Sequence, residues 1–431
     1  MGRTTAGAAA MSDTDTGDER TGGLRVAMRG RDPDEEHRTS TPLELLFDLT
    51  FVVAVSQAAL QLHHALAEGR LGPGVAAYAA VFFAIWWAWM NFTWFASAYD
   101  TDDVPYRLLT LVQMAGVLVL AAGVRSVFED GDFTVVVLGY VVMRLALISQ
   151  WVRAAVAHHE GRAGALRYAV GVALVQLGWI ARLWVPGAWA WPTFVVLVAA
   201  ELAVPAWAEF HRRRTPWHPG HIAERYGLFT IIVLGEVILA SFTAIRSVVA
   251  GRGLSASVLL VALGGLLMVF ALWWIYFAVG EAVLSSLRTA LTWGYGHYVV
   301  FAALAAIGAG LEAASAASEH HAHLSIRAAG LAVALPVALV LLVLGGLHRA
   351  GGTGVPGHAP LLAAGAAAVL VLGLCSPALG AGGAVLGMGL AVSATLAADL
   401  VVLRRRSGTP GPRAAHGHAR GPGRRGASGP S

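Results

Sequence analysis

The chain has 431 residues, of which 57% are hydrophobic and 13% are charged. Soluble domains carry about 25% charged residues, so a chain this apolar must place its excess apolar surface against lipid. The formal net charge of +4 is small, and we expect no nucleic-acid partner. The single cysteine, Cys375, excludes an intrachain disulfide or a cysteine metal site.

Residues 1–42 contain no apolar segment of the kind that a secretory signal needs, and we expect them to form a disordered cytoplasmic tail. About twelve apolar runs follow, each close to the roughly 20 residues with which a helix crosses a bilayer. They predict an all-α, polytopic integral membrane protein with transmembrane halves at 43–210 and 211–403 and a disordered basic tail at 404–431. The runs lie near 43–66, 74–97, 105–125, 133–156, 164–185, 190–210, 220–246, 255–279, 292–316, 326–348, 358–376 and 380–403.

The arginines are distributed unevenly between alternate connecting segments. If the N-terminus lies inside the cell, most of them fall on the inner side, including Arg212, Arg213 and Arg214. Positive residues concentrate in cytoplasmic loops. We therefore predict that both termini are cytoplasmic and that the number of spans is even.

A faint internal repeat relates the two halves. Glu44 opens the first span and Glu224 the seventh, and a tryptophan pair follows in the next span of each half, at 86–87 and 273–274. Six spans per half is an even number, which predicts two parallel repeats related by an axis along the membrane normal. The alternative is coincidence in a low-complexity apolar sequence.

Two acidic residues lie four apart in the first span, Glu44 and Asp48. Helical geometry stacks them on one face, which Ser56 and His63 continue. A charge deep in a bilayer costs roughly 2.5 to 3.5 kcal/mol and is usually retained for a reason, so Asp48 predicts an interior functional group or a buried ion pair. Glu44 follows Thr41 and Pro42, and capping of the helix is its alternative role.

The seventh span carries Arg225 and Glu236 on one face, eleven residues apart. They are separated by about 16 Å of helix rise, so each must find water or a partner on another helix. Arg144, in the fourth run, is a candidate counter-ion for one of the acids, and a structural ion pair is as plausible as a functional one. The other polar groups within the runs are Glu201, His297, Glu312 and Asp399.

Histidines and tryptophans supply further candidates. His297 lies between Tyr295 and Tyr298, and its alternatives are a tuned titratable group and an ordinary interfacial residue. Two histidine clusters, 63–64 and 319–323, could hold zinc or copper together, although adjacent loop histidines are commonly solvated. The tryptophans of the second run favour packing over a pore lining.

Five motifs stand out along the chain, at 43–57, 94–103 with Arg107, 221–236, 295–298 and 310–312. In combination they resemble the bacterial low temperature requirement protein A family. Small departures from its pattern occur at Leu46, Thr50 and Val237. The resemblance implies a polytopic bacterial inner-membrane protein with a link to growth in the cold, and it brings no defined reaction or substrate.

The leading hypothesis is a secondary transporter or ion-translocating protein in the bilayer, acting on a proton, a cation or another small solute. Its ion-binding candidates are Asp48, Glu236, Glu44, Arg225, Glu224 and His297. The first alternative is a non-transporting protein that affects bilayer or envelope properties in the cold, with structural ion pairs. A membrane-embedded enzyme acting on lipid is the second. No nucleotide-binding, nucleophile-elbow or zinc-protease motif occurs, so we expect no cofactor and no enzyme activity.

Overall fold

The computed structural model describes residues 24–33, 35, 38–209, 215–249, 256–278, 284, 286–319, 323–350 and 355–407, without the side chains of 247–249 and 405–407. Within these ranges the ordered elements are all helical. They are α1 (Pro42–Ala67), α2 (Leu71–Tyr99), α3 (Val104–Asp130), α4 (Thr134–Ala157), α5 (Arg162–Ala181), η1 (Arg182–Trp184), η2 (Gly187–Trp189), α6 (Ala190–Ala208), α7 (Pro219–Val249), α8 (Ala256–Ala278), α9 (Leu287–Ser318), α10 (Ile326–Ala350), α11 (His358–Leu374) and α12 (Ser376–Ser407).

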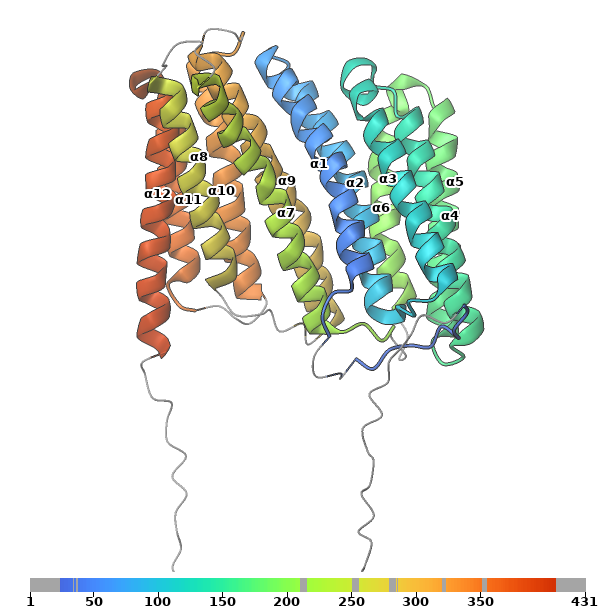
Figure 1. Ribbon diagram of the computed structural model, residues 1–431. Helices are drawn as coiled ribbons and strands as arrows, with labels where there is room; N and C mark the ends of the chain where they lie inside the picture. The colour runs from blue at the N-terminus through green and yellow to red at the C-terminus, as the bar shows by residue number, and fades with distance from the viewer. Residues whose placement is uncertain are drawn as a thin grey trace, which may run out of the picture.

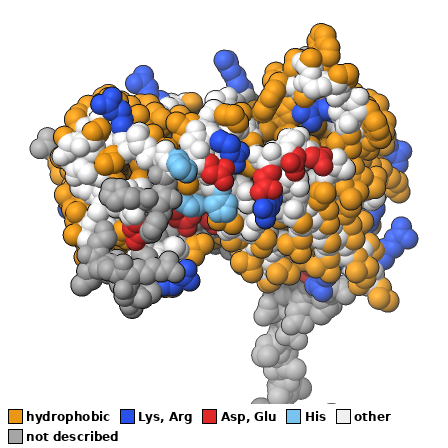
Figure 2. Space-filling view, turned by 90° about the horizontal axis from the view of Figure 1, so that it is seen from above, with side chains coloured by type: hydrophobic (Ala, Val, Ile, Leu, Met, Phe, Trp, Pro, Cys, Tyr) orange, Lys and Arg blue, Asp and Glu red, His pale blue; other side chains and the backbone are white. Residues whose placement is uncertain are grey.

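The predicted all-α, polytopic class is confirmed. In the described part of the chain, eleven helical segments are long and apolar enough to cross a membrane, and α11 is shorter, with 17 residues. The helices stand side by side, α1–α6 in one group and α7–α12 in the other (Figure 1). Seen end-on, acidic and histidine side chains gather in the middle of the face, with hydrophobic side chains around them (Figure 2).

The two groups meet along α1, α2, α7 and α9, which pack against one another. The start of α1 and the end of α12 lie at the same end of the bundle (Figure 1). This arrangement suits an even number of crossings. The assignment of that end to the cytoplasm stays a prediction from the arginine distribution.

The two groups of helices share part of their packing arrangement. Helices α1, α2 and α3 pack on one another as α7, α8 and α9 do, but α12 packs extensively on α8, whereas α6 has no comparable contact with α2. The tryptophan pairs that suggested the repeat also differ, since Trp86 and Trp87 are buried and Trp273 and Trp274 are about half exposed. The parallel repeat therefore stays a prediction.

The segment before α1 differs from the disordered tail expected for residues 1–42. Within its described part, Met28 and Arg38 are buried. Arg38 donates hydrogen bonds to the carbonyl oxygens of Ala96 and Ser97, which lie in the last turn of α2. Carbonyls in the last turn of a helix have few intrahelical partners, although that of Ala96 also accepts from the backbone N–H of Asp100 at 3.1 Å. The Arg38 guanidinium adds hydrogen bonds to both carbonyls and holds the segment against the bundle. Residues 408–431 lie outside the described part.

Candidate functional site

Polar side chains join α1 to α7 at three levels, and we call this set the α1–α7 ladder. Both helices begin with a proline, Pro42 and Pro219, at the same end of the bundle. Residues of α1 that share one face can therefore meet residues of α7 at successive depths. The three rungs are Glu44 with His221, Asp48 with Arg225, and Ser56 with Glu236.

The first rung combines both roles weighed for Glu44. Thr41 caps α1 by accepting from the backbone N–H of Glu44, while Oε2 of Glu44 accepts from the backbone N–H of Thr41 at 2.8 Å. This reciprocal arrangement is a capping box. The same carboxylate lies 3.2 Å from Nε2 of His221, and both side chains are fully buried. Glu44 thus fixes the start of α1 and also contacts α7.

The second rung is a buried ion pair. Nη2 of Arg225 donates to Oδ1 of Asp48 at 2.5 Å, with both side chains inaccessible to solvent. The indole Nε1 of Trp89, on α2, donates to the same oxygen at 2.7 Å. Each charge therefore has a partner on another helix, as the sequence analysis required. A packing role alone does not describe Trp89, since it stabilises the carboxylate directly.

Several polar atoms around the first two rungs have no hydrogen-bond partner among the described residues. They are Oε1 of Glu44, Oδ2 of Asp48, Nδ1 of His221, and Nε and Nη1 of Arg225. Buried polar atoms without protein partners are commonly bridged by internal water. Acceptors and donors both occur in this group, so it can bind water or a small polar solute.

The third rung holds Glu236 without an ion pair. Its Oε1 accepts a short hydrogen bond from the hydroxyl of Ser56. Among the described residues, no basic side chain interacts with it. Glu312, on α9, is close enough for the two carboxylates to repel each other. Gly308 of α9 packs against the Glu236 backbone, where a Cβ atom would lie 2.9 Å from its carbonyl oxygen.

Asp100 and Arg38 extend the polar region to the connection between α2 and α3, outside the spans. Burial, together with the nearby Glu44 carboxylate, raises the pKa of Asp100 from 3.8 to about 6, against the opposing effect of Arg38. Asp100 also accepts from the backbone N–H of Asp102 at 3.1 Å. Near neutral pH, the ionised Asp100 carboxylate therefore lowers the stability of the folded state.

Asp100→Asn is expected to stabilise the protein at pH 7 to 8. The raised pKa means that the folded state holds the proton more tightly than the unfolded chain, so the wild type loses stability as pH rises from about 4 to about 6. The difference between 3.8 and about 6 corresponds to at most about 3 kcal/mol. Unfolding midpoints of both proteins, measured from pH 4 to 8, should differ at the alkaline end and converge at pH 4. A gain that persists unchanged at pH 4 would contradict this explanation.

A second buried charge cluster lies inside the first half. Glu201, on α6, accepts from the indole N–H groups of Trp87 at 2.7 Å and Trp179 at 3.2 Å. Arg144, on α4, lies 3.5 Å from the same carboxylate and bonds the hydroxyl of Tyr140. The predicted counter-ion role of Arg144 thus has Glu201 as its partner. Glu201 was among the polar groups noted in the apolar runs, but nothing in the sequence paired it with Arg144.

A third cluster crosses the second half. Its acid, Asp399, was noted in the sequence as a polar group within a span, but its histidine partners were not predicted. Nδ1 of His358 lies 2.7 Å from Oδ1 of Asp399, and Nε2 of His358 lies 2.8 Å from Nδ1 of His348. His358 and Asp399 are buried. The Asp399 carboxylate accepts from Nδ1 of His358, which leaves Nε2 of the same ring to bond Nδ1 of His348. The carboxylate and the two imidazoles thus form a continuous hydrogen-bonded chain.

The other candidates lie apart from the deep rung. Glu224 is half-buried and accepts from the backbone N–H of Ser40 at 3.3 Å. His297 is buried rather than interfacial, with Nδ1 2.7 Å from the Trp293 carbonyl and Nε2 3.0 Å from the Tyr276 hydroxyl. Of the histidine clusters, residues 320–322 lie outside the described part. Within the described residues, no group of three or more His, Cys, Asp or Glu side chains could hold a metal ion.

Comparison with known proteins gives one family and one relative. The family model described as Bacterial low temperature requirement A protein (LtrA) matches residues 39–394, from just before α1 into α12. The chain is 28% identical over 263 residues to an uncharacterized protein of Rhizobium meliloti (strain 1021), RA0937. That match takes in 57% of this chain and 60% of the relative, so it spans less than two thirds of the relative's length.

Proposed function

Since the chain belongs to the bacterial low temperature requirement A (LtrA) family, we propose that it is a secondary transporter or ion-translocating membrane protein in which Glu236 takes up a proton or a cation. Eleven apolar helical segments of the described chain give it the build of a multi-pass membrane protein. In this proposal the membrane is the bacterial inner membrane, with both termini in the cytoplasm.

The observation that carries the proposal is the contrast between the two deep rungs of the ladder. Asp48 is bound by Arg225 and Trp89, so its charge is compensated without any bound ion. Among the residues that the structure describes, Glu236 accepts only from the Ser56 hydroxyl, and the Glu312 carboxylate is nearby. A buried carboxylate that has no basic partner among the described residues, with a second, half-buried carboxylate beside it, favours binding of a proton or a cation, because neutralisation removes their repulsion.

The position of Glu236 adds support. Ser56 belongs to the first half of the chain and Glu236 to the second, so a change in protonation alters a contact between the halves. About 12 Å of helix rise separates Ser56 from Asp48 on α1, so the ion pair lies between the deep rung and the end where α1 begins. Many transporters bind their coupling ion near the bilayer midplane, between moving halves.

The alternative function is a non-transporting membrane protein with structural charges. The paired clusters favour it, because Asp48 with Arg225, Glu201 with Arg144, and His358 with Asp399 are all buried and bonded between helices. Such pairs also hold bundles together. The two functions assign different roles to Glu236, which binds a proton or a cation only in the transporter.

The test is proton and cation flux in proteoliposomes under an imposed pH gradient. Glu236→Gln keeps the side-chain size and an oxygen for the Ser56 hydroxyl, while it removes the charge. We expect this variant to lose pH-dependent flux and to keep nearly the wild-type thermal stability, because no basic group is left unpaired. Glu129→Gln, at a half-exposed acid beside Arg125 on α3, is the matched control and should retain flux.

Two results would oppose the proposal. Wild-type protein that shows no flux of protons or monovalent cations above empty liposomes, at any pH tested, would remove the activity itself. A Glu236→Gln protein that transports normally would remove Glu236 from the pathway. Strong destabilisation of that variant in detergent would favour the structural alternative.

A further inference from the structure

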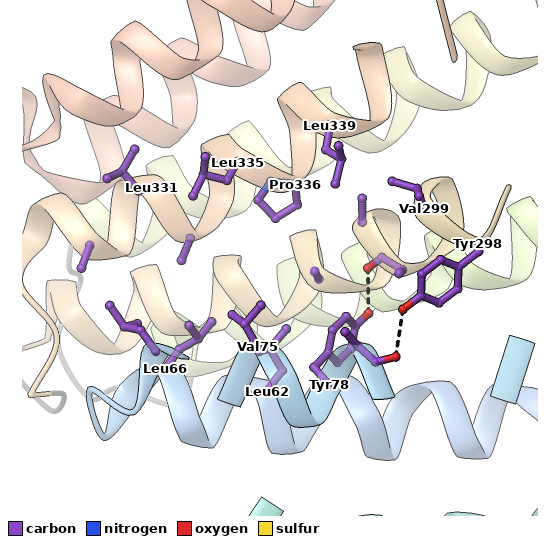
Figure 3. Close-up of a pocket in the computed structure, with 17 residues that line it drawn as sticks. Leu62, Leu66, Val75, Tyr78, Tyr298, Val299, Leu331, Leu335, Pro336 and Leu339 are labelled. Carbon is purple, nitrogen blue, oxygen red and sulfur yellow. Dashed lines mark hydrogen bonds between the residues drawn. The ribbon is translucent and has the colours of Figure 1, made fainter. Parts of the chain in front are cut away.

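A groove of about 670 Å³ lies between the two halves, within the membrane-spanning helices (Figure 3). Leu62 of α1 and Val75 of α2 belong to one wall, and Ala302 of α9 and Leu335 of α10 to the other. Ligand pockets in proteins typically measure about 300 to 1,000 Å³, so the groove has the size of a binding site rather than of a packing defect.

The groove is hollow because small residues line its second wall. This wall contains Ala302 and Ala306 of α9 with Ala328 and Ala332 of α10, and Pro336 interrupts the hydrogen bonding of α10. Large side chains at these positions would fill the space. The rim is formed by larger residues that are partly exposed, namely Leu71, Val75, Leu335 and Leu339. The groove therefore opens sideways, toward the lipid.

Its polar groups are already satisfied. Tyr78 and Tyr298 are the lining residues with polar side chains, and each donates a hydrogen bond across the boundary between the halves. The hydroxyl of Tyr78 bonds the carbonyl of Ala302 at 2.7 Å, and that of Tyr298 bonds the carbonyl of Ala79 at 2.8 Å. Both bonds are drawn in Figure 3. A ligand in the groove would find no free side-chain donor and only these two hydroxyl oxygens as acceptors, so its contacting part is expected to be hydrocarbon.

The length of the groove suits an acyl chain. From Ala328 to Leu339 the lining covers about 16 Å of α10. This is close to half of the roughly 30 Å hydrocarbon core of a bilayer, the depth of one leaflet.

We propose that the groove is a binding site for one acyl chain of a membrane phospholipid. The chain enters beside Leu71, at the first residue of α2, and its terminal part reaches Tyr298. No hydrophobic driving force favours it over bulk lipid. It is held because an unfilled hollow would forfeit the dispersion contacts of the lining. This proposal is independent of transport through Glu236.

The test uses full-length protein in phosphatidylcholine vesicles with a phospholipid that carries a diazirine near the end of one acyl chain. After irradiation, adducts are mapped by mass spectrometry. We expect the segment 299–306 of α9 to carry several-fold more label than Leu174 and Leu177, which lie on α5 and are each 62% exposed. Native mass spectrometry should also retain one phospholipid per chain.

Two substitutions fill the groove, Ala306→Phe inside it and Leu335→Trp at its rim. Each is expected to lower the labelling of α9 to the level of α5 and to remove the retained phospholipid, provided that thermal unfolding shows a folded protein. Leu174→Trp is the matched control and should change neither readout. Equal labelling of α5 and α9 in the wild type would mean ordinary surrounding lipid only and would overturn the proposal. Crosslinks between two copies through 299–306, or labelling that both filling variants leave unchanged, would overturn it too.

Discussion

Arg225→Gln is expected to lower the free energy of unfolding by about 3 to 5 kcal/mol, because it leaves the Asp48 carboxylate buried without its counter-charge. Asp48 and Arg225 are both completely buried, at 2.5 Å from each other. After the substitution, the indole of Trp89 is the remaining strong donor to that carboxylate. One hydrogen bond from a neutral donor to a charged group, worth about 1.5 to 3 kcal/mol net, does not replace a full positive charge.

A double substitution separates the charge from the shape. Asp48→Leu together with Arg225→Met removes both charges and leaves apolar groups of similar length. Apolar replacement of a whole buried pair is often neutral or stabilising, so the double variant should recover most of what Arg225→Gln loses. The measurement is reversible unfolding in mixed micelles with increasing SDS, followed by tryptophan fluorescence.

Arg107→Gln is the matched control for this prediction. Arg107 pairs with Asp102 at 2.7 Å, but both side chains are about half exposed. Exposed pairs add little to stability, since solvent and salt screen them. The control should therefore unfold almost as the wild type does. If Arg225→Gln unfolds at the same point as Arg107→Gln, Asp48 does not depend on the arginine and the second rung is not a structural pair.

The spans could be predicted because each depends on a local property, the length of an apolar run. The burial of Asp48 and Glu236 followed from the same reasoning, since a charge in lipid is costly and turns inward. The basic partner of Asp48 could not be predicted from the sequence. Helical periodicity assigns Asp48 to a face of α1, but only the packing of α1 on α7 decides that this face meets Arg225 rather than Arg144.

The missed contacts share a physical cause. Trp87 and Trp89 look alike in sequence, yet each donates its indole N–H to a different carboxylate, Glu201 or Asp48. Their directions depend on side-chain rotamers and on neighbouring helices, which no spacing rule contains. The chain from His348 through His358 to Asp399 similarly joins three helices, so its members lie far apart in sequence.

The Glu201 cluster predicts an unequal response to the loss of its two charges. Glu201→Gln is expected to cost about 3 to 5 kcal/mol, because Arg144 is then left buried with the Tyr140 hydroxyl alone. Nε and Nη1 of Arg144 already lack hydrogen-bond partners among the described residues. In addition, the new amide NH₂ group must face the N–H of Trp87 or Trp179, and two donors in contact leave one hydrogen bond unmade.

Arg144→Met should cost less, about 1 to 3 kcal/mol, because the Glu201 carboxylate keeps both indole donors. The arginine contributes only a long contact of 3.5 Å to it. SDS-induced unfolding of the two variants, with Glu129→Gln as an exposed acidic control, measures the order. Equal losses, or a larger loss for Arg144→Met, would mean that the carboxylate depends on the arginine more than on the tryptophans. The expected order would instead identify Trp87 and Trp179 as the groups that keep a charged acid inside the first half, which leaves Arg144 dependent on Glu201 rather than the reverse.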